Sequence, residues 1–173
     1  MRNSFTVATL ALAALVTWGS PPATAADQSE RGPSGLPIPR FVSLASGTVN
    51  VRMGPSTEHK VKWIFHKEGL PVEVVREYGN WRRVRDSDGE EGWVHQALLS
   101  GRRTALVGPW RDDNVPLRTN AKRDAPLAAL LQPFVLAEVE RCDGSWCAIS
   151  GSGWRGHVEQ AYLWGVYPSE QVD

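Results

Sequence analysis

The sequence predicts an all-β protein that consists of two small units in tandem. Among its 173 residues, 16 Gly and 12 Pro separate short segments and argue against a bundle of long helices. From Phe41 onward, strand-length stretches rich in Val and Trp alternate with turn sequences. A series of matching residues also recurs at an offset of 64 to 66 positions, as expected after a duplication.

The first 25 residues have the pattern of an export signal. Arg2 precedes a mostly apolar run from Phe5 to Trp18, and Ala23-Thr24-Ala25 offers small residues at the cleavage positions. A buried N-terminal helix is the alternative, but the prolines and polar residues that follow give such a helix nothing to pack against. We therefore expect a signal peptide over residues 1–25, cleaved after Ala25, and a periplasmic or secreted mature protein with no membrane-spanning segment.

Residues 26–40, rich in Pro, Gly, Ser and charge, separate this signal from the first unit and are predicted to form a linker. The first unit is expected over residues 41–107. Turn sequences such as Gly54-Pro55-Ser56 and Tyr78-Gly79-Asn80 divide it into strand-length segments. These segments are residues 49–52, 61–65, 72–76, 81–85 and 92–95.

The second unit is predicted over residues 108–168 as a degenerate copy, and residues 169–173 are expected to form a short tail. Val49-x-Val51-Arg52 recurs as Val115-x-Leu117-Arg118, and Gly79-Asn80-Trp81 recurs as Gly144-Ser145-Trp146. The longest match joins Gly92-x-Val94-x-Gln96-Ala97-x-Leu99 to Gly156-x-Val158-x-Gln160-Ala161-x-Leu163. Three matches in one order at a near-constant offset are not readily explained by chance.

Each unit contains about sixty residues, a size at which a single core is marginal. The two copies therefore have a reason to share an interface. Trp110, just before the second copy, and Trp164, at its end, are the candidates for that seam. The alternative, that each Trp only caps its own unit, fits the sequence equally well.

Charge and cysteine content argue against several classes of protein. The 19 Lys and Arg residues balance the 19 Asp and Glu residues, so the overall field does not favour binding to nucleic acid. Cys142 and Cys147 are the only cysteines, and an oxidising compartment would pair them in a structural disulfide. Their spacing differs from the Cys-x-x-Cys redox motif, and no Cys/His pair at zinc-site spacing accompanies them, so neither a metal nor a cofactor is expected.

The repeat offset gives the disulfide a mechanical role. At a shift of 65 residues Cys142 aligns with Glu77, and Cys147 aligns with Arg82. We therefore predict a Glu77–Arg82 ion pair in the first unit where the second unit has a covalent bond. An exposed cross-strand ion pair contributes at most about 1 kcal/mol, whereas a disulfide that closes so small a loop contributes roughly 2 kcal/mol.

Three motifs of the first unit follow one another in a distinctive order. They are Val49-Asn50-Val51-Arg52-x-Gly54-Pro55, Gly79-Asn80-Trp81 and Asp88-Gly89-x-x-Gly92-Trp93-Val94. This order resembles the bacterial SH3-like domain family, and the flanking residues 35–44 and 99–105 resemble its exported, tandem branch. The resemblance implies two tandem small SH3-like β-barrels outside the cytoplasm. Such domains commonly attach to cell-wall enzymes or bind peptide-like ligands.

The second unit departs from the family pattern at positions that matter for binding. Thr119-Asn120-Ala121 stands in place of Met53-Gly54-Pro55, and His157 stands in place of Trp93. If the first unit keeps a binding surface, the second has lost or changed it. We therefore expect ligand contacts to concentrate in residues 41–107.

Trp93 is the leading candidate for ligand binding because the second unit does not repeat it. An indole presents a large apolar face that stacks on apolar or sugar surfaces, and Tyr78 and Trp63 are its predicted companions in a shallow groove. The alternative is that Trp93 belongs to the core. Trp81 recurs as Trp146 directly after a turn, and we expect its ring to cover the open end of the small core.

Arg52 ends an alternating segment, so its side chain is expected to face outward or toward a partner loop. One interpretation is a bidentate clamp on a ligand carboxylate. The other is a structural ion pair with Glu73, Asp86 or Asp88, which is favoured because Arg118 keeps the residue in the degenerate copy.

The chain carries no recognisable catalytic arrangement. A Cys147–His157 pair is disfavoured by the expected disulfide, the acidic turn 86–91 is expected to be solvated, and His59, His66 and His95 lack ligand spacing. We therefore expect a non-catalytic exported binding module for cell-wall fragments, peptides or a protein partner in the cell envelope. The alternative is a structural or accessory protein of an envelope complex with no small ligand.

Overall fold

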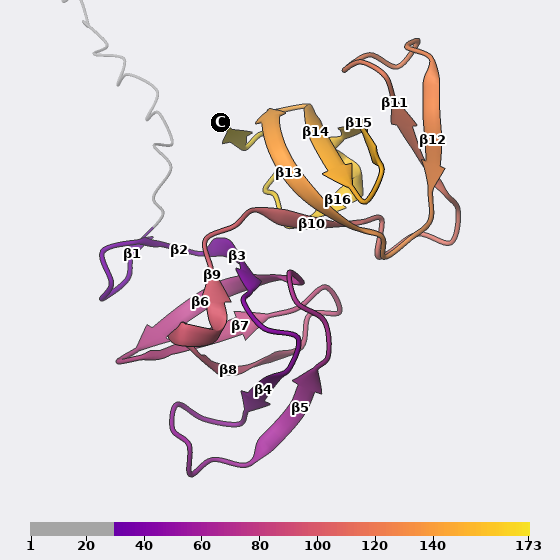
Figure 1. Cartoon of the computed structure of the whole chain (residues 1–173). Helices are drawn as coiled ribbons and strands as arrows, with labels where there is room; N and C mark the ends of the chain where they lie inside the picture. Colours follow the sequence, from indigo (N-terminus) through magenta and orange to yellow (C-terminus); the bar gives the residue numbers. More distant parts are fainter. Residues whose placement is uncertain (1–29) are drawn as a thin grey trace, which may run out of the picture.

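Regular structure in the computed structural model is almost entirely β, as Figure 1 shows. The structure describes residues 30–173, so the predicted signal peptide and its cleavage site at Ala25 lie outside the described residues. The strands form a seven-stranded sheet, an eight-stranded sheet and a two-stranded hairpin. Within residues 30–173 no helix is both long and apolar enough to cross a membrane.

The first sheet is curled around a small core of aliphatic side chains, with the strand order β5-β4-β8-β7-β6-β3-β9. Its strands are β3 (Arg40–Leu44), β4 (Val49–Arg52), β5 (Val61–Phe65), β6 (Pro71–Tyr78), β7 (Trp81–Arg85), β8 (Glu91–His95) and β9 (Leu99–Ser100). In β4, β7 and β8 alternate residues are buried, as the period of a strand requires, and Val51, Val84 and Val94 have no exposed surface. A register shift between Val74 and Arg76 bends β6 and helps the sheet to curl.

The second sheet has the strand order β12-β11-β15-β14-β13-β10-β16, with β17 paired to β13. Its strands are β10 (Thr104–Val107), β11 (Val115–Arg118), β12 (Leu127–Leu131), β13 (Leu136–Asp143), β14 (Trp146–Gly151), β15 (Trp154–Glu159), β16 (Leu163–Trp164) and β17 (Gln171–Val172). Leu117, Ile149 and Val158 form the centre of its core.

The two sheets are duplicates in strand order and in register. Arg52 of β4 pairs with Trp93 of β8, and the equivalent Arg118 of β11 pairs with His157 of β15. Both units also place one short 3-10 turn directly before the equivalent strands β9 and β16, at Gln96–Leu98 and at Gln160–Tyr162. The predicted all-β fold of two tandem barrels is therefore confirmed.

The ends of the two units differ from the expected boundaries. β10 lies within the range expected for the first unit, but it is hydrogen-bonded to β13 and β16 of the second sheet. Its four residues are all buried, and Ala105 and Val107 belong to the second core. The expected tail contains β17, which pairs with β13. The expected linker contains a hairpin of β1 (Glu30–Arg31) and β2 (Pro37–Ile38) that lies beside β6.

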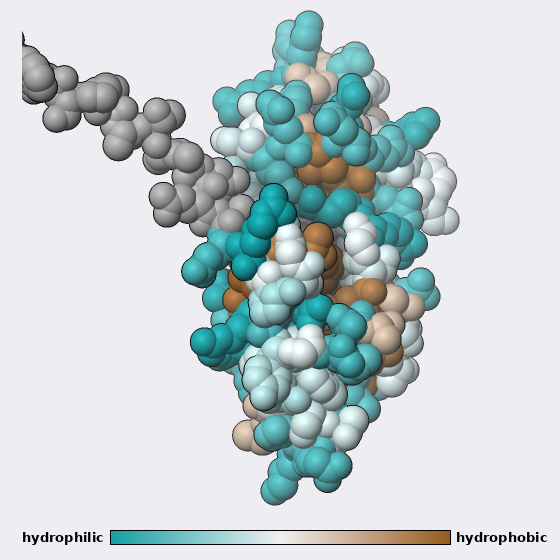
Figure 2. Space-filling model, turned by 90° about the vertical axis from the view of Figure 1, so that its left-hand side faces the viewer, coloured by the Kyte–Doolittle hydropathy of each residue, from teal (hydrophilic) through white to brown (hydrophobic). Residues whose placement is uncertain are grey.

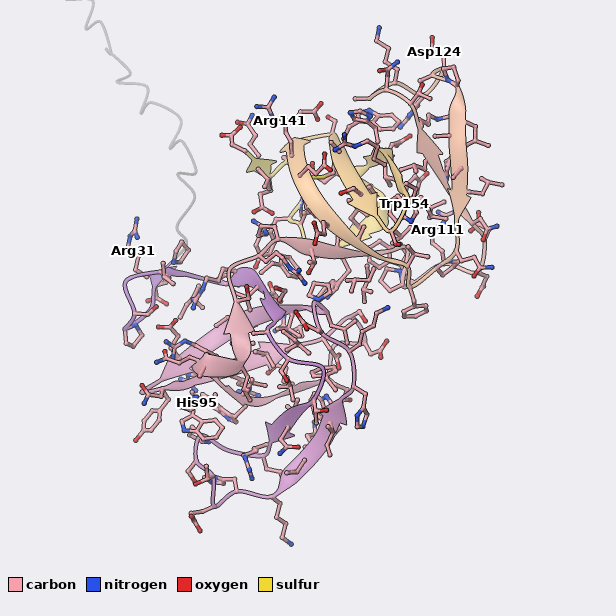
Figure 3. The ribbon with its side chains drawn as sticks, viewed as in Figure 1. Arg31, His95, Arg111, Asp124, Arg141 and Trp154 are labelled. Carbon is pink, nitrogen blue, oxygen red and sulfur yellow. A yellow bond between two sulfur atoms is a disulfide. The ribbon has the colours of Figure 1, made fainter. Side chains whose placement is uncertain are left out.

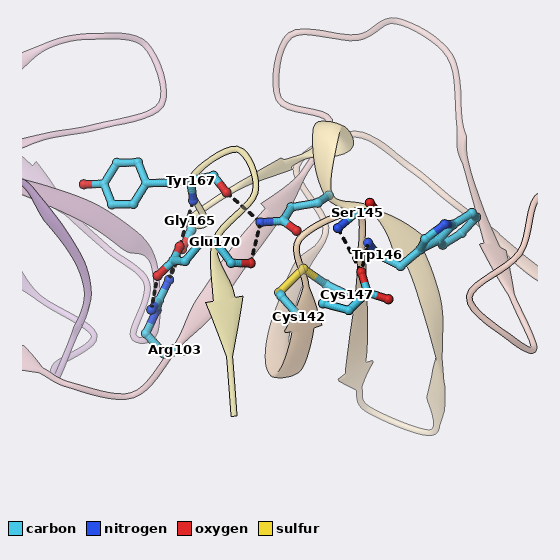
Figure 4. The surroundings of a disulfide bond; sticks show 10 residues. Arg103, Cys142, Ser145, Trp146, Cys147, Gly165, Tyr167 and Glu170 are labelled. Atoms are coloured by element: carbon cyan, nitrogen blue, oxygen red, sulfur yellow. Dashed lines mark hydrogen bonds and ion pairs between the residues drawn. A yellow bond between two sulfur atoms is a disulfide. The ribbon is translucent and has the colours of Figure 1, made fainter. Parts of the chain in front are cut away.

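The two equivalent turns are pinned as the repeat offset predicts. Cys142 and Cys147 are cross-strand partners joined by a disulfide (Figure 4), and Glu77 and Arg82 are the corresponding partners in the first unit, with Oε1 and Nε 3.2 Å apart. We expected this ion pair to be exposed, but it is buried, and the Glu77 side chain is only 1% exposed. Its carboxylate also accepts hydrogen bonds from Arg40 at 2.8 Å and from the Ser34 hydroxyl at 2.7 Å.

These partners make Glu77 the anchor of the N-terminal hairpin. Burial by itself raises the pKa of Glu77, but the hydrogen bonds from Ser34 and Arg40 and the charge of Arg82 outweigh burial and lower the pKa below its ordinary value. The charged form of Glu77 is therefore favoured by folding, and residues that were expected to be a linker are part of the first unit.

Replacing Glu77 with Gln should destabilise the first unit by about 3 kcal/mol at neutral pH, because two guanidinium groups lose their buried carboxylate. A lowered folded-state pKa contributes stability that is present above the ordinary value of 4.5 and is lost as pH falls through the folded value. Urea unfolding of wild type and Glu77→Gln between about pH 7 and pH 3 should therefore converge at low pH. Glu58→Gln, at an exposed position, is the control and should match wild type.

Reducing the Cys142–Cys147 disulfide should destabilise the second unit by roughly 2 kcal/mol and leave the first unit unchanged. Residue-resolved amide hydrogen exchange with and without reductant measures the two units separately. A Cys142→Ser, Cys147→Ser double variant should be insensitive to the reductant. Equal loss of protection in both units would contradict the assignment.

Candidate functional site

A cleft of about 900 Å³ lies between the two units. The first unit contributes Phe41, Glu73, Arg85 and the turn between β7 and β8, residues 87–89. The second unit contributes Trp110, the β13–β14 turn and the segment that follows β15. The face shown in Figure 2 has hydrophobic surface near the middle of the molecule, between two mostly polar ends.

Aromatic rings from both units meet at the base of this cleft. Phe41 of β3 contacts the Trp164 ring edge-on, with centroids 5.1 Å apart, and the Tyr167 ring at 4.7 Å. Trp164 is therefore at the seam, which is one of the two alternatives expected for it. Trp110 also lines the cleft, but its side chain is 57% exposed, so it stands at the rim and is not packed into the seam.

A hydrogen bond crosses the seam beside these rings. The Tyr167 hydroxyl donates to Glu73 Oε1 at 2.9 Å, and Arg85 donates to Glu73 Oε2 at 3.1 Å and to Glu91 Oε1 at 2.9 Å. Burial of Tyr167 and the adjacent charge of Glu73 raise the pKa of the phenol, so it stays protonated and acts as the donor. Glu73 is itself buried, which makes this contact costly to lose.

The loop that carries Tyr167 is held in place from two sides (Figure 4). Arg103, in the connector between the units, makes a bidentate contact to Glu170 at 2.8 and 3.0 Å and also donates to the Gly165 carbonyl. Glu170 in turn accepts from the Tyr167 backbone N–H at 2.8 Å. Gly165 has a φ of 124°, and a Cβ at this position would collide with the Thr104 carbonyl, so the close approach of loop and connector requires glycine.

The opposite wall of the cleft ends in the acidic β7–β8 turn. Asp86 Oδ1 accepts from the backbone N–H groups of Asp88 and Glu90 at 3.1 and 2.9 Å, and Gly89 adopts a φ of 84°. This turn sets Asp88 at the cleft, where it forms no ion pair within the described residues. The lining therefore has two carboxylates, Glu73 and Asp88, against one guanidinium, that of Arg85.

Comparison with known protein families identifies the two units. The sequence matches the bacterial SH3 domain over residues 45–101 and again over residues 111–165, which together make up more than half of the chain. The chain belongs to the bacterial SH3 domain family. Bacterial SH3 domains are binding modules, and here two of them stand in tandem, as the internal repeat predicts.

Comparison with solved structures adds little to the family assignment. NlpC2 from Trichomonas vaginalis is 10% identical, with a TM-score of 0.34, and the match covers 73% of this chain and 48% of that one. NlpC1 from the same organism is 11% identical, with a TM-score of 0.34, over 83% of this chain and 51% of that one. The chain thus spans about half the length of each, and a likeness this slight carries no argument. A comparison with curated proteins found no match.

The aromatic residues predicted to form a groove in the first bacterial SH3 domain do not come together. Trp63 is paired with the buried Val51 and packs against the core. Trp93 and Tyr78 lie on the outer face of the sheet, because their cross-strand partners on β7, Arg83 and Trp81, face outward. Tyr78 is 66% exposed, and none of the three lines the cleft. Binding at Trp93 and Tyr78 remains a prediction about a different surface of the domain.

Arg52 does not form the expected ion pair with Glu73, Asp86 or Asp88 within the described residues. Its Nη1 donates to the carbonyls of Thr57 and His59 at 3.0 and 2.8 Å, and the equivalent Arg118 donates to the Ala125 carbonyl at 2.8 Å. Both arginines hold the loop that follows their own strand. Backbone carbonyls thus take the place of the carboxylates expected for a structural role, and the clamp on a ligand carboxylate stays a prediction.

Trp81 does not cover the core of its domain, contrary to expectation. On β7 the inward positions are Arg82 and Val84, so Trp81 faces outward, where its ring meets His95 edge-on at 5.4 Å. Figure 3 marks His95 on this side of the first domain. The position directly after a turn indicated a ring over the core, but the register of β7 places the side chain on the opposite face of the sheet.

Four cleft residues were not proposed for binding from the sequence: Phe41, Glu73, Arg85 and Tyr167. Only Glu73 carried a usable signal, as a charged residue within the apolar run Pro71–Val75. Tyr167 sits at the end of the second domain, and nothing in the sequence indicates that it reaches the first. Within residues 30–173 no cluster of side chains suits a metal ion.

Tyr167→Phe should lower the free energy of unfolding by about 1–3 kcal/mol, because the buried Glu73 loses a hydrogen bond while the ring contact to Phe41 is kept. Tyr162→Phe, at a residue packed on the second core under Arg111, is the matched control. Urea unfolding followed by circular dichroism measures both. Equal effects of the two substitutions would contradict a special role for the seam hydroxyl.

Proposed function

We propose that the chain is a non-catalytic, exported binding module that recognises a cell-wall fragment or a peptide in the cell envelope. The ligand lies in the cleft between the two bacterial SH3 domains. The observation that supports this most directly is the shape and chemistry of the cleft, about 900 Å³ lined mostly by apolar surface, with aromatic rings from both domains and several polar side chains. Small-ligand pockets have volumes of about 300–1,000 Å³ and this kind of lining.

The lining suits an elongated ligand with an apolar part and a positive charge. Trp110 offers an exposed indole face at the rim, on which a sugar ring or an aliphatic side chain stacks. Asp88 and Glu73 outnumber the one guanidinium, whose three nitrogens already contact Glu73 and Glu91. An amino group on a peptide fits this balance better than a carboxylate, and the aromatic rings add cation–π attraction.

Binding in the cleft draws on both domains and not on residues 41–107 alone. The aromatic rim comes from the second domain, while the acidic wall comes from the first. Because each wall is part of a different barrel, the ligand also bridges the domains and stabilises their arrangement. The family supports a binding role, and both cysteines are held in the disulfide, in keeping with a module that does not catalyse.

Trp110→Ala should weaken binding to purified cell wall or to its soluble peptides by about thirtyfold, since an exposed Trp at a site rim commonly contributes about 2 kcal/mol. Trp93→Ala, on the outer face of the first domain, is the control and should bind as wild type does. Pull-down followed by calorimetry measures both.

The opposite pattern, loss of binding with Trp93→Ala alone, would move the site to the outer face of the first domain. A wild-type protein that retains neither cell wall nor peptides would leave the alternative of a structural or accessory envelope protein without a small ligand.

A further inference from the structure

Each sheet has two end strands within residues 30–173, a five-residue strand on one side and a two-residue strand, β9 or β16, on the other. The five-residue end strands are β5 in the first domain and β12 in the second, and they occupy the same place in the two strand orders. The registers align them residue by residue, since Val51 pairs with Trp63 and Leu117 pairs with Ala129. An edge strand exposes backbone N–H and C=O groups that can pair with another chain, so proteins usually protect it.

The edge of the first domain has such protection. Lys62 is the second residue of β5, and its Nζ donates to Glu90 Oε2 at 2.8 Å and to the Glu91 carbonyl at 3.2 Å. The same ammonium lies 4.9 Å from the centre of the Trp63 ring. A charged lysine on an edge strand opposes pairing with another strand, because pairing would desolvate the charge.

The edge of the second domain has lost this protection. Ala128 occupies the position of Lys62, and the whole run from Ala125 to Ala137 has no charged residue. Leu127, Leu130 and Phe134 in this run are 52%, 56% and 52% exposed. In Figure 1 the β11–β12 hairpin projects from the rest of the domain, so another chain has access to β12. Figure 3 marks Asp124 at the tip of the same hairpin.

We propose that β12 pairs edge to edge with β12 of a second copy of this chain, antiparallel, so that one sheet continues across two copies. Because β12 is neutral and apolar, its pairing with β12 of a second copy desolvates no charged side chain of either strand. The antiparallel arrangement also separates Lys122 and Arg123 of one copy from those of the other, because the basic residues lie at only one end of the strand. A parallel arrangement would bring the like charges together.

The pairing closes at two copies. Within residues 30–173 β12 is the one five-residue end strand without a charged residue, because β5 carries Lys62 and the remaining end strands have two residues each. A two-fold contact between β12 strands uses up this edge and does not propagate into fibres. None of the residues of β12 lines the cleft between the domains, so both clefts of the pair stay open. A dimer therefore presents two clefts, which increases retention on a polymer that repeats its ligand.

Sedimentation velocity of the full chain over a range of concentrations tests this proposal, with Leu130→Lys and Ile64→Lys as a matched pair. These two residues hold equivalent, exposed positions on β12 and β5. Wild type and Ile64→Lys should dimerise alike, while Leu130→Lys should raise the dimer dissociation constant by about tenfold or more. Ala128→Lys, which restores the lysine of the first domain, should act in the same direction.

Hydrogen exchange supplies a second readout that does not depend on the variants. Amides of β12 should become protected as the wild-type concentration rises, while those of β5 should not. The proposal is overturned if wild type stays monomeric at every concentration, if the two lysine variants shift the equilibrium equally, or if β12 gains protection only when a different protein is added. Binding to cell wall by a monomeric wild type would leave the cleft proposal intact while removing this one.

Discussion

The hydrogen bond from Tyr167 to the buried carboxylate of Glu73, with the Phe41 ring packed against the same tyrosine, is the contact on which the arrangement of this protein depends. Each barrel has a core of few residues, and neither would be expected to be very stable alone. The contact links the two domains and at the same time lies at the base of the cleft. The contacts of Tyr167 with Glu73 and Phe41 therefore contribute both to the stability of the protein and to the shape of the candidate site.

The equivalent strands β6 and β13 are each covered by an additional segment near their turn, but the segments are held by different interactions. In the first domain the strand β6 is covered near its turn by the N-terminal hairpin, which Ser34 ties to Glu77. In the second domain the equivalent strand β13 is covered by β17, which pairs with it at Cys142. A buried ion pair can bind a neighbouring segment through its remaining lone pairs, whereas a disulfide cannot, so the second domain uses backbone pairing for the same purpose.

The features that the sequence predicted correctly are local or repeated. Short alternating runs gave the strands, and the offset between the copies gave both the duplication and the alignment of Glu77–Arg82 with the disulfide. The errors arise where a side chain's role depends on register or on distant segments. Trp81 was assigned to the wrong face, the partners of Arg52 are carbonyls of a loop with no charge pattern, and the cleft depends on a loop near the C-terminus that was expected to mark the end of the second domain.

The replacement of Arg82 by Cys147 in the second copy has a consequence for a neighbouring glutamine. In the first domain Gln96 accepts a hydrogen bond from Arg82 at 2.5 Å and donates to Asn80. In the second domain the equivalent Gln160 has no guanidinium to accept from, and its amide donates to the carbonyls of Tyr167 and Glu170 at 2.6 and 3.1 Å. In the second domain the glutamine amide therefore holds the loop whose Tyr167 contacts the first domain. The two copies have thus diverged in role, because the glutamine that bonds within its own turn region in the first domain fixes the loop carrying Tyr167 in the second.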